Sequence, residues 1–252
     1  MRQAFAIAFL LFGIAFGGAE AADKLILVTP VNSIDTLVSE VILRKAYKRL
    51  GIDVQINKYP AERALKMADR GHVDGEVQRI AGINRVYRNL LPVETEINYI
   101  EATVFSKTKD FKVDGWQSLK PYRIGYIIGI KFAETNTVGM KRQAVGNYER
   151  LALMLDGGRV DIIVSPRNNG WYQFKKLKVT GIRELKPAVQ RFGLFHYLHK
   201  KNAELVPKIS AVLKAMTASG ELAAIRQRVI EVLLQQAERD EPVCDKDYKC
   251  FD

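Results

Sequence analysis

The chain has 252 residues, of which 48% are hydrophobic and 27% charged, and its formal net charge at pH 7 is +11. This length suffices for one large domain or two small lobes with cores of their own, and the composition excludes bulk disorder. The basic residues are spread along the chain without a nucleic-acid-binding motif. They indicate a solvated basic surface and predict no nucleic-acid partner.

The first 21 residues have the layout of a cleavable secretory signal. Met1-Arg2 is a basic start, residues 4–16 are an uncharged apolar run, and Ala19-Glu20-Ala21 is a small-residue cleavage motif. The run is shorter than the ~20 residues that a membrane span needs, which disfavours a retained anchor helix. We therefore expect cleavage near Ala21 and a soluble protein outside the cytoplasm.

The following segment alternates strands and helices. A short apolar run predicts the first strand, and helical spacing follows it, with Ser33 or Asp35 able to cap the helix start. Pro60 opens a second helix. The expected elements are a strand over 24–29, a helix over 34–50, a strand over 52–58, a helix over 60–71 and a strand over 73–77. This order predicts a mainly parallel sheet flanked by helices.

A second α/β unit follows a long extended run. The expected elements are an extended run over 96–106, a strand over 122–128, a helix over 148–155, a strand over 160–164, an extended run over 191–199 and two helices over 205–216 and 222–233. Ser219-Gly220 separates the two final helices. The fold class is therefore α/β, with two units of similar order.

An internal similarity connects the two units. Residues 62–74 align with residues 149–161 without a gap, and seven of the thirteen positions are identical. Each copy ends a helix, turns at Gly and enters an apolar strand. Chance similarity of amphipathic helices is the alternative, but Gly-x-Val-Asp stands at the same place in both units, which favours two matching lobes. Asp74 and Asp161, the last residues of the two copies, are also candidate acids.

Cys244 and Cys250 are the only cysteines, and five residues separate them. In an oxidising compartment this spacing predicts a local disulfide that holds the C-terminal segment in place. A zinc site needs about four ligands, and no His lies nearby. We expect neither a metal nor another cofactor.

This order of motifs resembles that of the type II periplasmic solute-binding proteins, in particular the extracellular solute-binding family 3 that includes the polar amino-acid receptors of ABC importers. The motifs are the signal, Gly71-His72-Val73-Asp74-Gly75, a crossover, Gly158-Arg159-Val160-Asp161, a return crossover and C-terminal helices. The resemblance covers almost all of the chain after the signal. It implies a periplasmic monomer with a lobe 1 over 23–105 plus 196–252, a lobe 2 over 106–195 and two crossover strands. It also implies that Asp74 and Asp161 are turn residues between a helix and a strand rather than acids.

A ligand of such proteins lies between the lobes, which close on it about a hinge. In open α/β sheets, ligands bind beyond the carboxyl ends of the strands, so the residues there are candidates. A guanidinium binds a carboxylate through two parallel hydrogen bonds, so arginines at these positions are candidate ligand-binding residues. The predicted ligand-binding residues are Asn32, Tyr59, Arg63, Glu76, Arg79, Tyr126, Lys131, Ser165, Arg167 and Asn168.

Two departures from the amino-acid receptors bear on the ligand. Those proteins usually place Thr or Ser and then Arg after the first Gly-x-Val-Asp, where this chain has residues 80–85, so that Arg79 or Arg85 would substitute. They usually place an Asp for the α-ammonium after the second motif, where Pro166 stands. This second departure disfavours an ordinary α-amino acid. The expected ligand is a small polar molecule that bears a carboxylate, an amino acid or an organic acid. Arg79 and Arg167 from the two lobes suggest acidic groups at both of its ends.

The resemblance leaves three functions open. The first is a receptor that delivers its ligand to the membrane permease of an ABC importer, and the second is a ligand-sensing subunit of a membrane kinase. The third is an enzyme similar to cyclohexadienyl dehydratases, with Glu76 as a general acid beside Arg. Because no paired-carboxylate, Ser-His or Cys-His arrangement stands out, we expect a binding protein rather than an enzyme.

Overall fold

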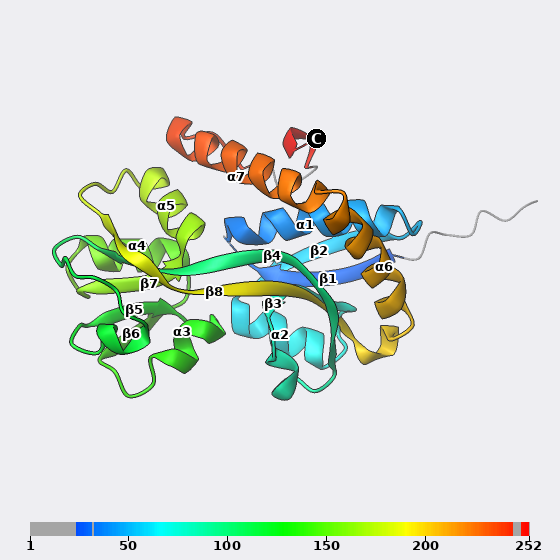
Figure 1. Ribbon diagram of the computed structural model, residues 1–252, viewed down its shortest axis with the longest axis horizontal. Helices are drawn as coiled ribbons and strands as arrows, with labels where there is room; N and C mark the ends of the chain where they lie inside the picture. The colour runs from blue at the N-terminus through cyan, green and yellow to red at the C-terminus, as the bar shows by residue number, and fades with distance from the viewer. Residues whose placement is uncertain (1–23, 32, 244–247, 252) are drawn as a thin grey trace, which may run out of the picture.

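The computed structural model describes residues 24–31, 33–243 and 248–251. The expected signal peptide, Asn32 and Cys244 lie outside the described residues, so the cleavage, the role of Asn32 and the disulfide stay predictions. Figure 1 shows two lobes connected by two long strands. The predicted two-lobed α/β fold is confirmed.

Lobe 1 is built on three parallel strands in the order β2-β1-β3. The core between this sheet and α1, α6 and α7 contains most of the buried side chains of α1, and α2 covers the opposite face (Figure 1). The elements are β1 (Lys24–Pro30), α1 (Ile34–Lys48), β2 (Asp53–Tyr59), α2 (Ala61–Asp69), β3 (Gly75–Ile80), η1 (Ile83–Arg85), η3 (Lys200–Asn202), α6 (Leu205–Ala218), α7 (Glu221–Arg239) and η4 (Lys249–Phe251).

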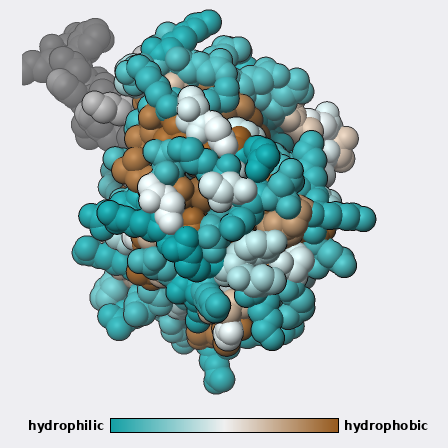
Figure 2. All heavy atoms as spheres, turned by 90° about the vertical axis from the view of Figure 1, so that its left-hand side faces the viewer, coloured by the Kyte–Doolittle hydropathy of each residue, from teal (hydrophilic) through white to brown (hydrophobic). Residues whose placement is uncertain are grey.

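Lobe 2 repeats the arrangement with the parallel strands β7, β5 and β6. Side chains of α3 pack in one of its two cores and those of α4 and α5 in the other. The elements are η2 (Trp116–Leu119), β5 (Ile124–Ile127), α3 (Lys131–Asn136), β6 (Arg142–Val145), α4 (Tyr148–Asp156), β7 (Ile162–Pro166) and α5 (Arg167–Lys176). Figure 2, which faces the lobe 2 end, shows a mainly hydrophilic surface with separate apolar patches.

The crossovers are β4 (Leu90–Ser106) and β8 (Arg183–His199), two antiparallel strands of 17 residues each. They join the lobes into one sheet of order β2-β1-β3-β8-β4-β7-β5-β6. The predicted extended runs over 96–106 and 191–199 were too short. Pro92 and Pro187 lie where the register of the pair shifts, and proline is ordinarily a strand breaker. The lobe boundaries within these strands stay a prediction.

The repeated turn is confirmed in both lobes. Gly71 has a φ of +74° and Gly158 one of +66°, in the left-handed region that glycine adopts without strain. Asp74 Oδ2 then accepts a hydrogen bond of 2.7 Å from the N–H of Ile26, and Asp161 Oδ2 accepts one of 2.9 Å from the N–H of Arg123. Both aspartates therefore hold the turn against the neighbouring strand, as predicted.

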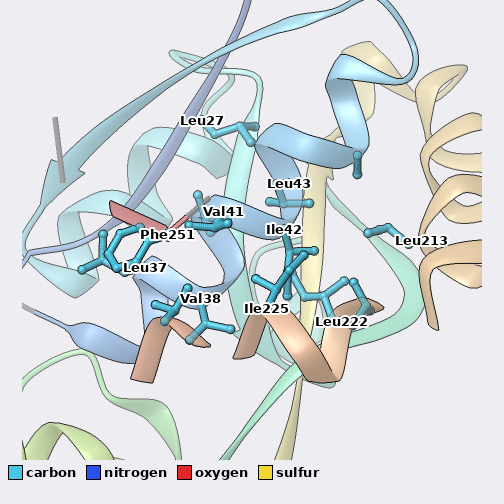
Figure 3. Close-up of a cluster of buried hydrophobic side chains, with 14 of the residues drawn as sticks. Leu27, Leu37, Val38, Val41, Ile42, Leu43, Leu213, Leu222, Ile225 and Phe251 are labelled. Carbon is cyan, nitrogen blue, oxygen red and sulfur yellow. The ribbon is translucent and has the colours of Figure 1, made fainter. Parts of the chain in front are cut away.

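The main core of lobe 1 is drawn in Figure 3, where α1 side chains such as Val38 and Ile42 face Leu222 and Ile225 of α7. Phe251, from the last described turn, is buried in the same core. Burial of a Phe side chain contributes about 2 kcal/mol, which ties the C-terminal end to α1. No helix among residues 24–31, 33–243 and 248–251 has the length and apolar character that crossing a membrane requires.

Candidate functional site

A small cavity of about 60 Å³ lies between the lobes, at the carboxyl ends of β1, β3 and β7. We call it the interlobe cavity. Its lining side chains come from both lobes and from both crossover strands, and they are Pro30, Ser33, Asp35, Thr36, Gln78, Arg79, Ile80, Ile83, Ile100, Ile130, Lys131, Phe132, Tyr148, Pro166, Asn169 and Leu194.

Arg79 is the buried cation of this lining. It stands on β3 and is 7% exposed; its Nη2 donates to the carbonyl of Ala61 at 2.9 Å, and its Nε lies 3.1 Å from Glu76 Oε1. A guanidinium carries five N–H bonds. Among the described residues, no acceptor is found for the N–H bonds of Arg79 beyond these two contacts. The guanidinium therefore has donors left for a ligand.

Glu76 is the counter-charge of Arg79 and is fully buried. Neither carboxylate oxygen has a well-aligned hydrogen-bond donor among the described residues, so the contact with Arg79 is an ion pair. Burial raises the pKa of Glu76 to about 7, although Arg79 opposes the shift. Glu76 does not belong to the lining of the cavity. Its only link to the cavity shown here is therefore its ion pair with Arg79.

One contact between the lobes joins the start of α1 to the start of α5. Asp35 accepts hydrogen bonds from the side-chain amides of Asn168, at 3.1 Å, and of Asn169. The first N–H of α1, from Ile34, donates to Asn169 Oδ1 at 2.8 Å. Burial raises the pKa of Asp35 to about 6, against the effect of the two amides. A residue of lobe 2 thus caps a helix of lobe 1.

This contact corrects the predicted cap. Ser33 occupies the N-cap position of α1, but its side chain makes no capping hydrogen bond, and Asp35 bonds to lobe 2 instead. The prediction that Ser33 or Asp35 caps the helix was therefore wrong. The physical reason is that Asn169, which no local pattern brings near, supplies the acceptor that a cap residue would otherwise provide.

A second contact between the lobes joins α2 to α3. Lys131 Nζ lies 2.7 Å from Glu62 Oε2 and 3.0 Å from Glu134 Oε2, and the hydroxyl of Tyr87 donates to Glu62 Oε1. Burial opposes ionisation of Glu62, but Lys131 holds the pKa of that carboxyl below its usual range. Gly129 packs against the start of α2 at the same contact, because a Cβ atom at this position would lie 2.6 Å from the backbone N of Glu62. The lobes are closed on each other.

The structure brings four of the predicted site residues to this region. Arg79 and Lys131 line the cavity, Glu76 pairs with Arg79, and Asn168 binds Asp35 beside the cavity. These residues stand on β3 or in the first turns of α3 and α5, each of which follows a strand; their role in ligand binding stays a prediction. Asn32 lies outside the described residues.

Four other predicted residues lie away from the cavity lining. The guanidinium of Arg63 lies 5.0 Å over the ring of Tyr59, and Arg63 borders an open depression along α2. Tyr126 is buried in a lobe 2 core. Ser165 is buried, and its hydroxyl donates to the carbonyl of Pro166.

Arg167 is also absent from the lining. Its guanidinium is paired with Glu101 on β4 and with Glu184 on β8, at 3.0 Å in the second case. The expectation of one ligand arginine from each lobe is therefore without geometric support on the lobe 2 side. The strand-end rule gave the position of Arg167 in the chain, but not the direction of its side chain.

Sequence reasoning missed several lining residues. Asp35 and Asn169 stand in the first turns of helices that follow strands, which is a signal that could have identified them. Tyr148 begins α4 and lines the cavity, and burial raises the pKa of its hydroxyl. The apolar lining residues gave no signal, because each of them resembles an ordinary core residue in sequence.

No protein-family model matches the chain. An uncharacterised protein of Shewanella oneidensis is 24% identical over 214 residues, which cover 79% of this chain and 78% of that protein. A crystal structure of a histidine kinase sensor domain with similarity to periplasmic binding proteins has a TM-score of 0.69 at 15% identity, covering 82% of this chain and 95% of the sensor domain.

Two further solved structures are of binding proteins. An amino acid ABC transporter substrate-binding protein of Streptococcus pneumoniae, bound to L-arginine, has a TM-score of 0.66 at 14% identity, with 85% of this chain and 95% of that chain covered. An ancestral arginine-binding protein bound to glutamine has a TM-score of 0.65 at 14% identity, with coverages of 84% and 96%. At these identities the likeness establishes the two-lobed periplasmic-binding-protein-like fold.

Proposed function

We propose that this protein is an exported receptor that closes its two lobes on a small carboxylate-bearing molecule for a partner in the membrane. The observation that carries the proposal is the interlobe cavity, in which Arg79 presents unused N–H donors. Charge-assisted hydrogen bonds from a guanidinium are the strong contacts that proteins make to carboxylates. Membership of the solute-binding family 3 and a periplasmic, monomeric state belong to the same proposal.

In such a receptor, closure of the two lobes is the change that the membrane partner would recognise. The contacts Asp35–Asn168/Asn169 and Glu62–Lys131 both join side chains of opposite lobes, so both must break when the lobes separate. The Glu62–Lys131 pair is partly exposed, and such ion pairs typically contribute below about 1 kcal/mol on their own. A ligand that contacts both lobes would shift the balance toward the closed form.

The partner is either the permease of an ABC importer or a membrane kinase. The solved structures of this fold include an ABC transporter receptor and a kinase sensor domain, so each role has a precedent. The dehydratase-like alternative required Glu76 to reach the substrate, and its position behind Arg79 favours the binding role instead. An affinity pull-down from a membrane extract with the closed, ligand-loaded protein would separate the two partners.

A thermal-shift screen of residues 22–252 tests the receptor. The compounds are amino acids, mono- and dicarboxylates, aromatic acids and small sugars, each also followed by small-angle X-ray scattering for closure. A ligand at a hundred times its dissociation constant adds about 2.7 kcal/mol of stability, which raises Tm by ~2–4 °C for a chain of this size. We expect a shift with carboxylates alone. Sugars as the sole stabilising class, or no shift with any class, would contradict the proposal.

A further inference from the structure

The open depression along α2 gathers basic side chains at the surface of lobe 1. It has a volume of about 580 Å³, and its charged or titratable lining residues are Glu62, Arg63, Lys66, Arg70 and His72. The other face of α2 is buried in lobe 1. Arg63, Lys66 and Arg70 are exposed. Because positions three and four apart lie on one side of a helix, these three cations share its solvent-facing side.

These cations have few partners within the chain. Lys66 Nζ lies 3.6 Å from Glu62 Oε1, and the guanidinium of Arg63 lies over the ring of Tyr59. Among residues 24–31, 33–243 and 248–251, no ion pair involves Arg63 or Arg70. Glu62 is the one carboxylate in the described lining, and it is already paired with Lys131 of lobe 2. The depression therefore carries more positive charge than the carboxylate of its lining balances.

The second copy of the repeat shows that the fold does not require this charge. At the offset of 87 residues, Lys66 aligns with Leu153 and Arg70 aligns with Gly157. Leu153 is 48% exposed, so the corresponding helix face in lobe 2 meets solvent without a cation there. Like charges four positions apart on a helix repel each other and destabilise it slightly. The repeat is thus built without these two cations, and an anionic partner would account for them.

Glu62 connects the depression to closure of the lobes. Helices α2 and α3 face each other across the seam between the lobes, and Lys131 Nζ on α3 lies 2.7 Å from Glu62 Oε2 (Figure 1). When the lobes separate, Lys131 moves away with lobe 2. The carboxylate of Glu62 is then left to the cations of its own depression, Lys66 above all. The depression is therefore more positive in the closed form than in the open form.

We propose that the open depression along α2 is the docking surface for an acidic segment of the membrane partner, and that Glu62 makes this docking depend on closure. The inference rests on the proposed function, since it names the chemistry by which the partner recognises the closed receptor. An extended acidic segment can enter a depression, whereas a flat anionic bilayer would contact only its rim. Complementary charge of this kind speeds encounter and selects the partner.

An acidic peptide tests the surface without the natural partner. The measurement is the fluorescence anisotropy of a labelled hexaglutamate peptide with residues 22–252 at low ionic strength, where screening is weakest. Lys66→Gln combined with Arg70→Gln should weaken binding about five-fold. Arg150→Gln combined with Arg159→Gln is the matched control, because it removes two exposed lobe 2 cations and should change the affinity less than two-fold. Equal losses in both double variants would show that binding follows net charge, which would overturn the inference.

The dependence on closure is tested at Glu62. Lys131→Gln deprives Glu62 of its interlobe partner and should weaken peptide binding about three-fold, and adding Glu62→Gln should restore the affinity. Lys120→Gln, at an exposed lobe 2 position, removes the same single charge and should have no effect. Unchanged binding in Lys131→Gln, or a loss that Glu62→Gln does not reverse, would contradict the role of Glu62. Circular dichroism of each variant shows that a loss of affinity is not a loss of folding.

The docking surface and the receptor function fail separately. If a carboxylate raises Tm but the Lys66/Arg70 variant binds the peptide like its control, the receptor stands and the docking surface is wrong. If the peptide binds as expected but no compound raises Tm, the surface stands and the receptor is wrong. Phosphatidylglycerol vesicles that bind through Lys66 and Arg70 when the peptide does not would identify a lipid surface and overturn the inference.

Discussion

The two copies of the helix–turn–strand repeat agree up to their aspartates and differ beyond them. Asp74 and Asp161 make the same hydrogen bond to the N–H of the neighbouring strand segment. Past these turns, the buried charges Glu76 and Arg79 of lobe 1 align with Ile163 and Pro166 of lobe 2, at the offset of 87 residues. The repeat thus preserves the turn, while at these two aligned positions only lobe 1 carries charged residues.

The largest expected effect concerns Glu76, which has no charged counterpart in lobe 2. Its pKa is raised to about 7 by burial, whereas an unfolded Glu titrates near 4.5. Between these values the unfolded chain releases a proton that the folded chain keeps, so the free energy of unfolding falls as the pH rises from about 4.5 to 7. The loss is complete above pH 7, absent below pH 4.5, and roughly 3 kcal/mol in size.

The Glu76→Gln variant should lose this slope. The measurement is the free energy of unfolding in urea from pH 4.5 to 8 for the wild type and the variant. Because Asp35 titrates in both proteins, its contribution cancels in the difference. If the free energy of unfolding changes with pH in the same way in both proteins, Glu76 is ionised in the folded wild type over the whole range from pH 4.5 to 8.

The two turns should respond alike when their aspartates are removed. Asp74→Ala and Asp161→Ala each delete a charged acceptor of a main-chain N–H together with an ion pair, to Lys201 and to Arg123 respectively. We expect each to lower the free energy of unfolding by about 2 kcal/mol. The corresponding Asn variants retain a side-chain oxygen and should lose less. A large effect in one lobe only would contradict the equivalence of the turns.

The contact of Gly129 with α2 gives a way to hold the lobes apart. A Cβ at this position would lie 2.6 Å from the N of Glu62, so Gly129→Ala should prevent complete closure and lower ligand affinity about ten-fold, through a loss of ~1.4 kcal/mol. Gly139→Ala is the matched control, since Gly139 also has a positive φ, +78°, but nothing within 4 Å of its Cβ position. The measurement is calorimetric affinity, with scattering for closure. Equal affinities in the two variants would place the closing contact elsewhere.

The smallest expected effect concerns Arg167. Because Glu101 and Glu184 already pair its guanidinium outside the cavity lining, Arg167→Gln should change ligand affinity less than two-fold. Calorimetric titration of the variant with the carboxylate-bearing compound that the thermal-shift screen ranks first checks this. A ten-fold loss would restore the expectation of one ligand arginine in each lobe.

The sequence was sufficient for the α/β order, the two lobes and the repeated turn, because these depend on periodicity and on local signals such as Gly71 and Gly158. It also placed Arg79 and Lys131 at the interlobe cavity, since strand ends converge there. It did not predict the partners of those side chains. The pairing of Arg167 with Glu184, or of Asp35 with Asn169, joins residues that are 17 and 134 positions apart, respectively, and no local pattern encodes such contacts.

The most direct test of the central claim is a crystal structure of residues 22–252 with the carboxylate-bearing compound that the thermal-shift screen ranks first. The account predicts closed lobes and the carboxylate between them, at hydrogen-bonding distance from Arg79, about 2.7–2.9 Å. A ligand bound elsewhere, for example in the open depression along α2, or a carboxylate that points away from Arg79, would contradict it.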